Sequence, residues 1–205
     1  MVVLFWTHYQ RFYLYSDFKE KILTFFCFFS YTLFMKNLEK EKLKTLLSII
    51  KENPSLDIAH FTDQNSPLVE LLNDYTRQHG YGYQLNLLDN AIEEPMSQRY
   101  KSSSTKVNFF HLQRKSYLIQ AKQYDFVFVT ANIEEEIESD FLKRLHQVIR
   151  NAGNLIVFIK KEDYMLRYRW IELLEEHNYV ATNTIDNLCN DYDIVITKKM
   201  HGWGK

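Results

Sequence analysis

The stretches that decide the fold are YDFVFVT at residues 124–130, NLIVFI at 154–159, YVATNTI at 179–185 and YDIVITK at 192–198. Each is a short run rich in apolar and β-branched residues, which is typical of strands buried in a sheet. Between the first two runs lies a helical pattern that ends before Gly153, a residue expected to cap it. Its inward-facing residues are Phe141, Leu142, Leu145, Val148 and Ile149. This order predicts a right-handed parallel crossover.

A second helix is predicted over residues 163–177, with Leu166, Trp170, Ile171, Leu173 and Leu174 facing inward. The strand at 179–185 and the last strand are separated only by residues 186–191. A parallel crossover needs about a dozen residues, so this link predicts an antiparallel pair. The fold class that follows is α/β, a three-layer doubly wound, mostly parallel sheet that ends in an antiparallel hairpin.

The first half of this domain gives a weaker pattern. An amphipathic helix is predicted over 37–52 and stops at Asn53-Pro54, and a strand follows at 55–61. Ser66-Pro67 is typical of a helix start and Gly80 of a helix end, and a second strand follows at 83–88.

Residues 90–106 are polar, contain Pro95 and a run of serines, and predict a mobile surface loop. After it we expect a strand at 107–112 and a helix at 114–123, although the periodicity of both segments is mixed.

Residues 1–34 differ from the rest, with eight Phe, four Tyr and one Trp and no Ala, Gly, Pro or Asn. The nearly uncharged run over 22–35 is shorter than the roughly twenty residues of a membrane-spanning helix. Two interpretations fit: an amphipathic or interfacial helix, or a translated upstream stretch in front of a true start at Met35. The expected division is an appendage at 1–34, a leading amphipathic helix at 35–54, and the α/β domain at 55–205.

Composition excludes little but points to a reducing compartment. The formal net charge is −1, which gives no support for nucleic-acid binding. The two cysteines are too few for a disulfide framework, and the scattered histidines show no metal-ligand spacing. We therefore expect a cytoplasmic protein without a metal site, with membrane contact only through residues 1–34.

The second half resembles the class I S-adenosyl-L-methionine (SAM)-dependent methyltransferases. The similar stretches are YDFVFVT, FLKRLHQVIRNAGNLIVFIKK, WIELLEEHNYVATNTI and YDIVITKKM, in the order and spacing of that family. The resemblance implies this fold and SAM as cofactor, but it identifies neither an acceptor nor a catalytic base.

The same resemblance implies the cofactor-binding residues. The family's loop has an acidic residue, an apolar one and then G-x-G-x-G, and the place taken as equivalent reads Asp57-Ile58-Ala59-His60-Phe61-Thr62-Asp63, without glycines. It implies that Asp57 faces the methionine end of SAM and that Asp89 binds the ribose hydroxyls. Thr130 and Asn132 would line the pocket, whereas Phe61 would place a bulky side chain where the adenosyl group lies. The expected cofactor-binding set is Asp57, Ala59, Phe61, Asp63, Asp89, Thr130 and Asn132.

Each of these residues also has a structural interpretation. Asp57 could cap a turn, Asp89 could be a solvated carboxylate, and Asn132 could cap the helix that begins with Glu134, Glu135 and Glu136. Three possibilities remain open: a SAM-dependent methyltransferase of unknown acceptor, a non-catalytic methyltransferase-like interaction module that has lost SAM binding, or a peripheral membrane protein anchored by residues 1–34.

Overall fold

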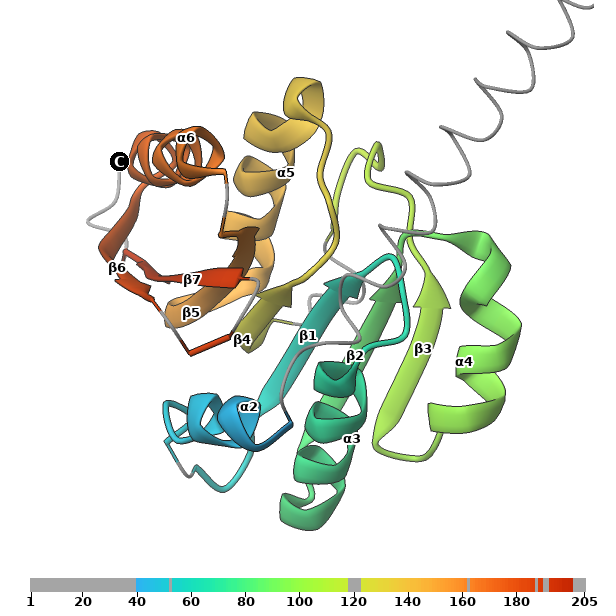
Figure 1. Ribbon diagram of the computed structural model, residues 1–205. Coiled ribbons are helices and arrows are strands. Elements are labelled where there is room, and N and C mark those ends of the chain that lie inside the picture. The colour runs from blue at the N-terminus through green and yellow to red at the C-terminus, as the bar shows by residue number, and fades with distance from the viewer. Residues whose placement is uncertain are drawn as a thin grey trace, which may run out of the picture. The chain divides into compact units, whose positions relative to one another are not determined.

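A seven-stranded sheet forms the centre of the described chain (Figure 1). The computed structural model describes residues 40–51, 53–117, 123–161, 163–186, 188–189 and 192–200. The strand order is β3-β2-β1-β4-β5-β7-β6. The strands are β1 (Asp57–Thr62), β2 (Gly82–Leu87), β3 (Thr105–Phe109), β4 (Tyr124–Val129), β5 (Ile149–Lys160), β6 (Tyr179–Ile185) and β7 (Tyr192–Lys199).

The pairing of these strands confirms the predicted fold class. Strands β1 to β5 pair in parallel, whereas β7 runs antiparallel to both β5 and β6. The short link after β6 therefore closes a hairpin, as its length requires.

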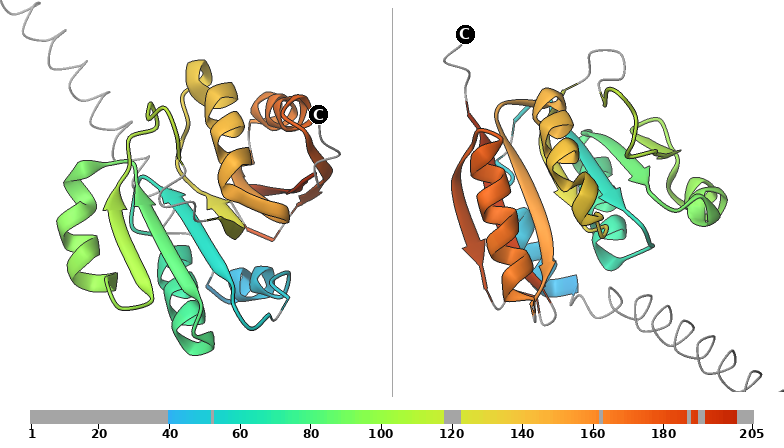
Figure 2. Two further views of the ribbon diagram at one scale, coloured as in Figure 1. Left: turned by 180° about the vertical axis from the view of Figure 1, so that it is seen from behind. Right: turned by 90° about the horizontal axis from the view of Figure 1, so that it is seen from above.

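Helices cover both faces of the sheet (Figure 2). Within the described residues they are α2 (Lys40–Leu47), α3 (Pro67–His79), the 3-10 turn η2 (Asn90–Ile92), α4 (Glu93–Tyr100), α5 (Glu135–Val148) and α6 (Tyr164–Glu176). Helices α5 and α6 bury Phe141, Leu142, Leu145, Trp170 and Leu174 against one face of the sheet. Fully burying one such side chain contributes about 1.5–3 kcal/mol, so this layer is a main source of stability.

Helix α3 begins and ends where the sequence predicts. Ser66 is its N-cap residue, Pro67 occupies the first helical position, and Gly80 follows the last turn with φ 69°. The N–H of Gly80 donates to the carbonyl of Thr76, which ends the helix in the left-handed conformation that suits glycine.

Two segments differ from the prediction. The expected loop at 90–106 contains η2 and α4, because Pro95 stands in the first turn of α4, where a helix does not need its N–H. Gly153 does not cap α5: the helix ends at Val148, and Gly153 lies inside β5.

The predicted helix at 114–123 is absent from residues 114–117, and residues 118–122 lie outside the described ranges. The expectations for residues 1–34 also lie outside them. Within the part of the chain that is described, no helix is both long and apolar enough to cross a membrane.

Candidate functional site

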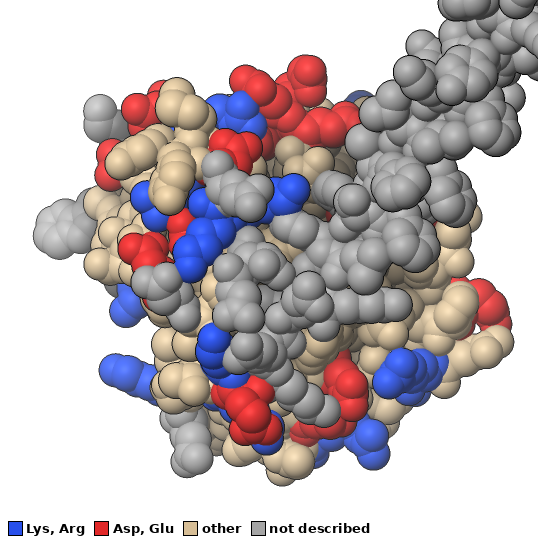
Figure 3. Space-filling model, viewed as in Figure 1, with Lys and Arg blue, Asp and Glu red and all other residues tan. Residues whose placement is uncertain are grey.

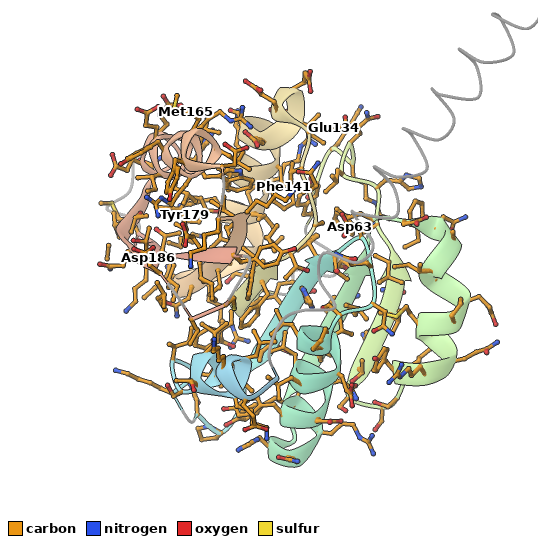
Figure 4. All side chains as sticks on the ribbon, viewed as in Figure 1. Asp63, Glu134, Phe141, Met165, Tyr179 and Asp186 are labelled. Atoms are coloured by element: carbon orange, nitrogen blue, oxygen red, sulfur yellow. The ribbon has the colours of Figure 1, made fainter. Side chains whose placement is uncertain are left out.

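A cleft of about 660 Å³ opens where β1 to β4 end, beside the amino end of α5. The carboxyl edge of an open α/β sheet is the usual position of a ligand site, because the loops that leave parallel strands meet there. The lining residues are Asp63, Leu88, Phe109, Phe110, His111, Leu112, Gln113, Arg114, Asn132, Glu134 and Ile137. Figure 4 labels Asp63 and Glu134, which enter the cleft from β1 and α5.

Asp63 is the first residue after β1 and carries an unused acceptor atom. Its Oδ2 accepts a hydrogen bond from the backbone N–H of Asn132 at 3.2 Å. Its Oδ1 is buried and has no hydrogen-bond partner within the described structure. Burial raises the pKa of this carboxyl group, and the charge of Asp89 raises it further. A donor from a ligand would satisfy Oδ1 and offset the cost of burying it.

Asp89 follows the end of β2 and caps η2. Its Oδ1 accepts a hydrogen bond from the backbone N–H of Ala91 at 2.8 Å, which leaves Oδ2 for another donor. Asp63 and Asp89 follow the ends of β1 and β2, which are paired in parallel, and Leu88 beside Asp89 lines the cleft although Asp89 itself does not. The carboxylate is therefore both a turn cap and a candidate ligand-binding group.

The turn that leads from β1 to α3 consists of residues 63–66, which is the place of the family's glycine loop. None of these four residues has a positive φ. The hydroxyl of Thr62 donates to the carbonyl of Gln64 at 2.9 Å and helps to shape the turn. This turn therefore needs no glycine conformation, and the absence of glycine from it causes no backbone strain.

The structure corrects the register assumed for the cofactor loop. Asp57 is the first residue of β1 and lies at the amino end of the strand, opposite to the cleft. There it pairs with Arg150 at 3.4 Å. Residues 57–62 form the strand itself, so the loop starts six residues later than expected.

Ala59 and Phe61 are also corrected by this register. Both are buried in the core layer below α5 and α6, and neither lines the cleft. Phe61 packs edge-on against Phe110 and Phe141, with ring centroids 5.1 and 5.6 Å apart. Its side chain therefore does not occupy the cleft, and the expected obstruction by Phe61 is not present.

Asn132 lines the cleft through a loop position and not as a helix cap, since the N-cap residue of α5 is Glu134. Glu134, Glu135 and Glu136 are exposed at the amino end of α5, where the helix dipole favours negative charge. Acidic side chains gather over this end of α5 in Figure 3. The cleft entrance on this side is therefore acidic.

Thr130 is buried just after β4 and belongs to a chain of hydrogen bonds that the sequence did not reveal. His60 Nδ1 lies 3.0 Å from the Tyr83 hydroxyl, and His60 Nε2 lies 2.8 Å from Thr130 Oγ1. The Thr130 hydroxyl donates to the carbonyl of Phe61, so it accepts from the Nε2–H group of His60. Nδ1 of the same ring then carries no proton and accepts from the Tyr83 hydroxyl. Burial lowers the pKa of His60 to about 3, so its ring is neutral.

Residues 109–114 form the outer wall of the cleft, which the sequence does not predict. The predicted third strand continued to Leu112, whereas β3 ends at Phe109 and the following residues turn across the sheet edge. The carbonyl of Leu112 accepts hydrogen bonds from the Tyr117 hydroxyl at 2.6 Å and from Arg144 Nη1 at 2.9 Å. This wall is therefore anchored to α5.

The described residues contain no group of three or more His, Cys, Asp or Glu side chains arranged to hold a metal ion. The chemistry available in the cleft is that of carboxylates, amides, aromatic rings and one guanidinium group. Such a site can bind ammonium and hydroxyl groups at its acidic floor.

Comparison with known proteins finds no matching family model and no matching curated protein. Solved structures do match. A TehB-like SAM-dependent methyltransferase of Corynebacterium glutamicum aligns with a TM-score of 0.62 and 11% identity, over 78% of this chain and 87% of that chain. A SAM-dependent methyltransferase of Aquifex aeolicus gives 0.62 and 11%, over 80% and 91%.

A third match is the 1,6-didemethyltoxoflavin-N1-methyltransferase of Burkholderia thailandensis, solved with 1,6-didemethyltoxoflavin and S-adenosylhomocysteine. Its TM-score is 0.56 and its identity 13%, over 95% of this chain and 90% of that chain. Identities this low establish architecture and not activity. The chain described here has the fold of the class I SAM-dependent methyltransferases.

Proposed function

We propose that this protein is a SAM-dependent methyltransferase, whose cofactor occupies the cleft at the carboxyl ends of β1 to β4. The observation that carries the proposal is that Asp63, which lines a cleft of about 660 Å³, has a buried Oδ1 atom without a donor among the described residues. Ligand pockets generally have volumes of about 300–1,000 Å³, so a molecule of this size can be accommodated.

The residues present fit the proposed cofactor. Asp63 would accept from the amino group of the methionine part, and Asp89 Oδ2 would accept from the ribose hydroxyls. Asn132 would line the same space, while Thr130 supports the end of β4 from within the protein. The carboxylate of Asp63 also favours a cationic ligand, because burial alone makes its ionised form unfavourable.

The bound cofactor supplies an electrophilic methyl group on a positively charged sulfur atom. An acceptor with a lone pair would take this methyl group, and the sulfur would keep the electron pair of the broken bond. The protein's part is to bind and orient both reactants, which can supply several kcal/mol of the barrier, on the order of 7–11 in well-aligned systems.

A second function is favoured by one feature of the same site. Each position of the turn at 63–66 carries a side chain where the family has glycines, so Cβ atoms stand close to where a cofactor backbone contact would form. The alternative is a non-catalytic methyltransferase-like interaction module that has lost SAM binding.

Calorimetric titration of SAM and S-adenosylhomocysteine into the full chain distinguishes the two. We expect micromolar affinity, a rise in Tm with ligand concentration, and at least about tenfold weaker binding in Asp63→Asn, since a hydrogen bond to a charged group contributes about 1.5–3 kcal/mol. Asp74→Asn on α3 is the matched control and should bind normally. No heat and no change in Tm at millimolar ligand would overturn the methyltransferase proposal and leave the interaction module as the remaining candidate.

The compartment and the first residues are part of the proposal. Cys189 is buried, and the two cysteines of the chain are too few for a disulfide framework, which suits a reducing cytoplasm. Intact-mass measurement of the native protein tests a start at Met35, and a species that begins at Met1 would refute it. Cell fractionation with and without residues 1–34 tests whether those residues hold the protein at a membrane.

A further inference from the structure

Arg114 is the positively charged side chain among the described residues that line the cleft, and the proposed cofactor does not use it. Asp63, the neighbouring Asp89 and Glu134 are acidic and suit a cationic ligand. Arg114 lines the same cleft from the wall of residues 109–114, and its positive charge would repel a sulfonium group. A second molecule with the opposite charge is the natural partner of this guanidinium.

Arg114 has no carboxylate partner among the described residues. Arg99, Arg144, Arg150, Arg167 and Arg169 all lie within 4.0 Å of an Asp or Glu oxygen. The guanidinium of Arg114 instead lies over the ring of Phe110, with its central carbon 5.4 Å from the ring centroid. The ring of Phe110 covers one planar face of the guanidinium, and the N–H groups at the edge of the guanidinium can bind a ligand.

The wall that presents Arg114 is fixed in place. The backbone N–H of Arg114 donates to the carbonyl of His111 at 3.3 Å, which closes a turn over residues 111–114. Within this turn, the carbonyl of Leu112 is held by Tyr117 and Arg144. Phe110 and Tyr117 are themselves buried in the core. The backbone that carries the guanidinium is thus held in a defined position, which lowers the entropy cost of binding.

Aromatic rings stand next to this charge. Phe109 and His111 pack edge to face with their centroids 4.5 Å apart, and both line the cleft. His111 is exposed, and Phe109 is half-buried. Together the two rings give a planar ligand an edge and a face to pack against.

We propose that Arg114, with His111 and Phe109, binds the methyl acceptor, and that the acceptor is an aromatic acid with its carboxylate on the guanidinium. A carboxylate matches the fork of N–H donors on arginine, and a ring attached to it reaches Phe109 and His111. That the bound acid is a methyl acceptor rests on the proposed function, whereas the anion site itself rests on the geometry of the cleft.

Ligand-observed NMR with benzoate as probe, and neutral benzamide of the same shape as comparison, tests the assignment on the full chain. We expect benzoate to bind at least about tenfold more tightly than benzamide, and Arg114→Gln to remove this preference, because a charge-assisted hydrogen bond is worth about a factor of ten or more. Arg77→Gln, which removes an exposed arginine from α3, is the charge-matched control and should keep it.

Running each titration with and without saturating S-adenosylhomocysteine separates the two proposals. If S-adenosylhomocysteine does not bind but benzoate binds through Arg114, the methyltransferase proposal fails and the anion site stands. If S-adenosylhomocysteine binds and benzoate shows no preference over benzamide, the aromatic-acid assignment is overturned. It is also overturned if Arg114→Gln weakens S-adenosylhomocysteine and leaves benzoate unchanged, since the anion would then be the cofactor's own carboxylate.

Discussion

The carboxylate of Asp63 accepts a hydrogen bond at 3.2 Å from the backbone N–H of Asn132, a residue 69 positions further along the chain. The bond joins the turn after β1 to the turn after β4, two neighbouring strands of the sheet. The floor of the cleft is therefore formed by a contact between two turns that are distant in the sequence. The environment of the Asp63 carboxyl group raises its pKa.

Asp63→Asn should stabilise the free protein at neutral pH by up to about 1 kcal/mol while it weakens ligand binding. A carboxyl group with a raised folded-state pKa costs stability once ionised, and an amide can still accept from Asn132. The cost is absent below the unfolded pKa of 3.8 and grows as pH rises through the folded value. Denaturant unfolding of both proteins from pH 3 to 7 measures this cost, and a lower free energy of unfolding for the variant at pH 7 would contradict the expectation.

His60 should make the protein less stable as pH falls from 6.5 toward about 3. Its folded pKa is depressed, so the unfolded chain binds a proton in this range and the folded chain does not. His60→Gln should flatten this part of the stability curve, with an overall loss of about 1–3 kcal/mol from the altered hydrogen bonds to Tyr83 and Thr130. His79→Gln, on the exposed end of α3, serves as the control and should keep the original slope.

Asp57→Ala should lower stability and leave S-adenosylhomocysteine affinity unchanged. Asp57 pairs with Arg150, which also contacts both carboxylate oxygens of Asp125 at 2.8–2.9 Å. The group is partly exposed, so its loss should cost about 1 kcal/mol and less at high salt. Parallel calorimetry on Asp57→Ala and Asp63→Ala checks this, and equal losses of affinity in both would contradict the position of Asp57 at the far edge.

Gly153→Ala should destabilise the protein more than Gly80→Ala. A Cβ at Gly153 would meet the carbonyl oxygens of Arg150 and Asp125 at 2.9 and 3.0 Å, which are backbone atoms that cannot move aside cheaply. Overpacking of this kind costs about 1–3 kcal/mol. At Gly80 the space is open and only the φ of 69° opposes a side chain, for about 1 kcal/mol. Thermal unfolding of the two variants ranks them, and the reverse order would refute this account.

The second half of the fold could be predicted from the sequence because its strands are continuous apolar runs with helices of clear periodicity between them. Helix α3 could be predicted because Ser66-Pro67 and Gly80 have local conformational reasons to stand at helix ends. Helix α4 could not, because Pro95 and the serines look like loop residues although proline is tolerated in a first helical turn.

The candidate site was only partly predictable. Asp63, Asp89 and Asn132 follow strand ends and could be placed at the ligand edge. Because no glycine marks the loop, however, the sequence places the motif at residues 57–63, of which residues 57–62 form β1. The contributions of His60 and Arg114 depend on which strands become neighbours and where β3 stops, and no local pattern contains that information.

The turn at 63–66, which uses only ordinary backbone angles, has a consequence for how this protein could change over time. A glycine-built cradle is nearly closed to substitution, since most replacements would distort it. Here the path of the chain needs no glycine, and an exchange at Asp63, which lines the cleft, would alter the chemistry that faces a ligand. A library that randomises these four positions should yield many folded variants, so new ligands could be acquired by side-chain replacement alone.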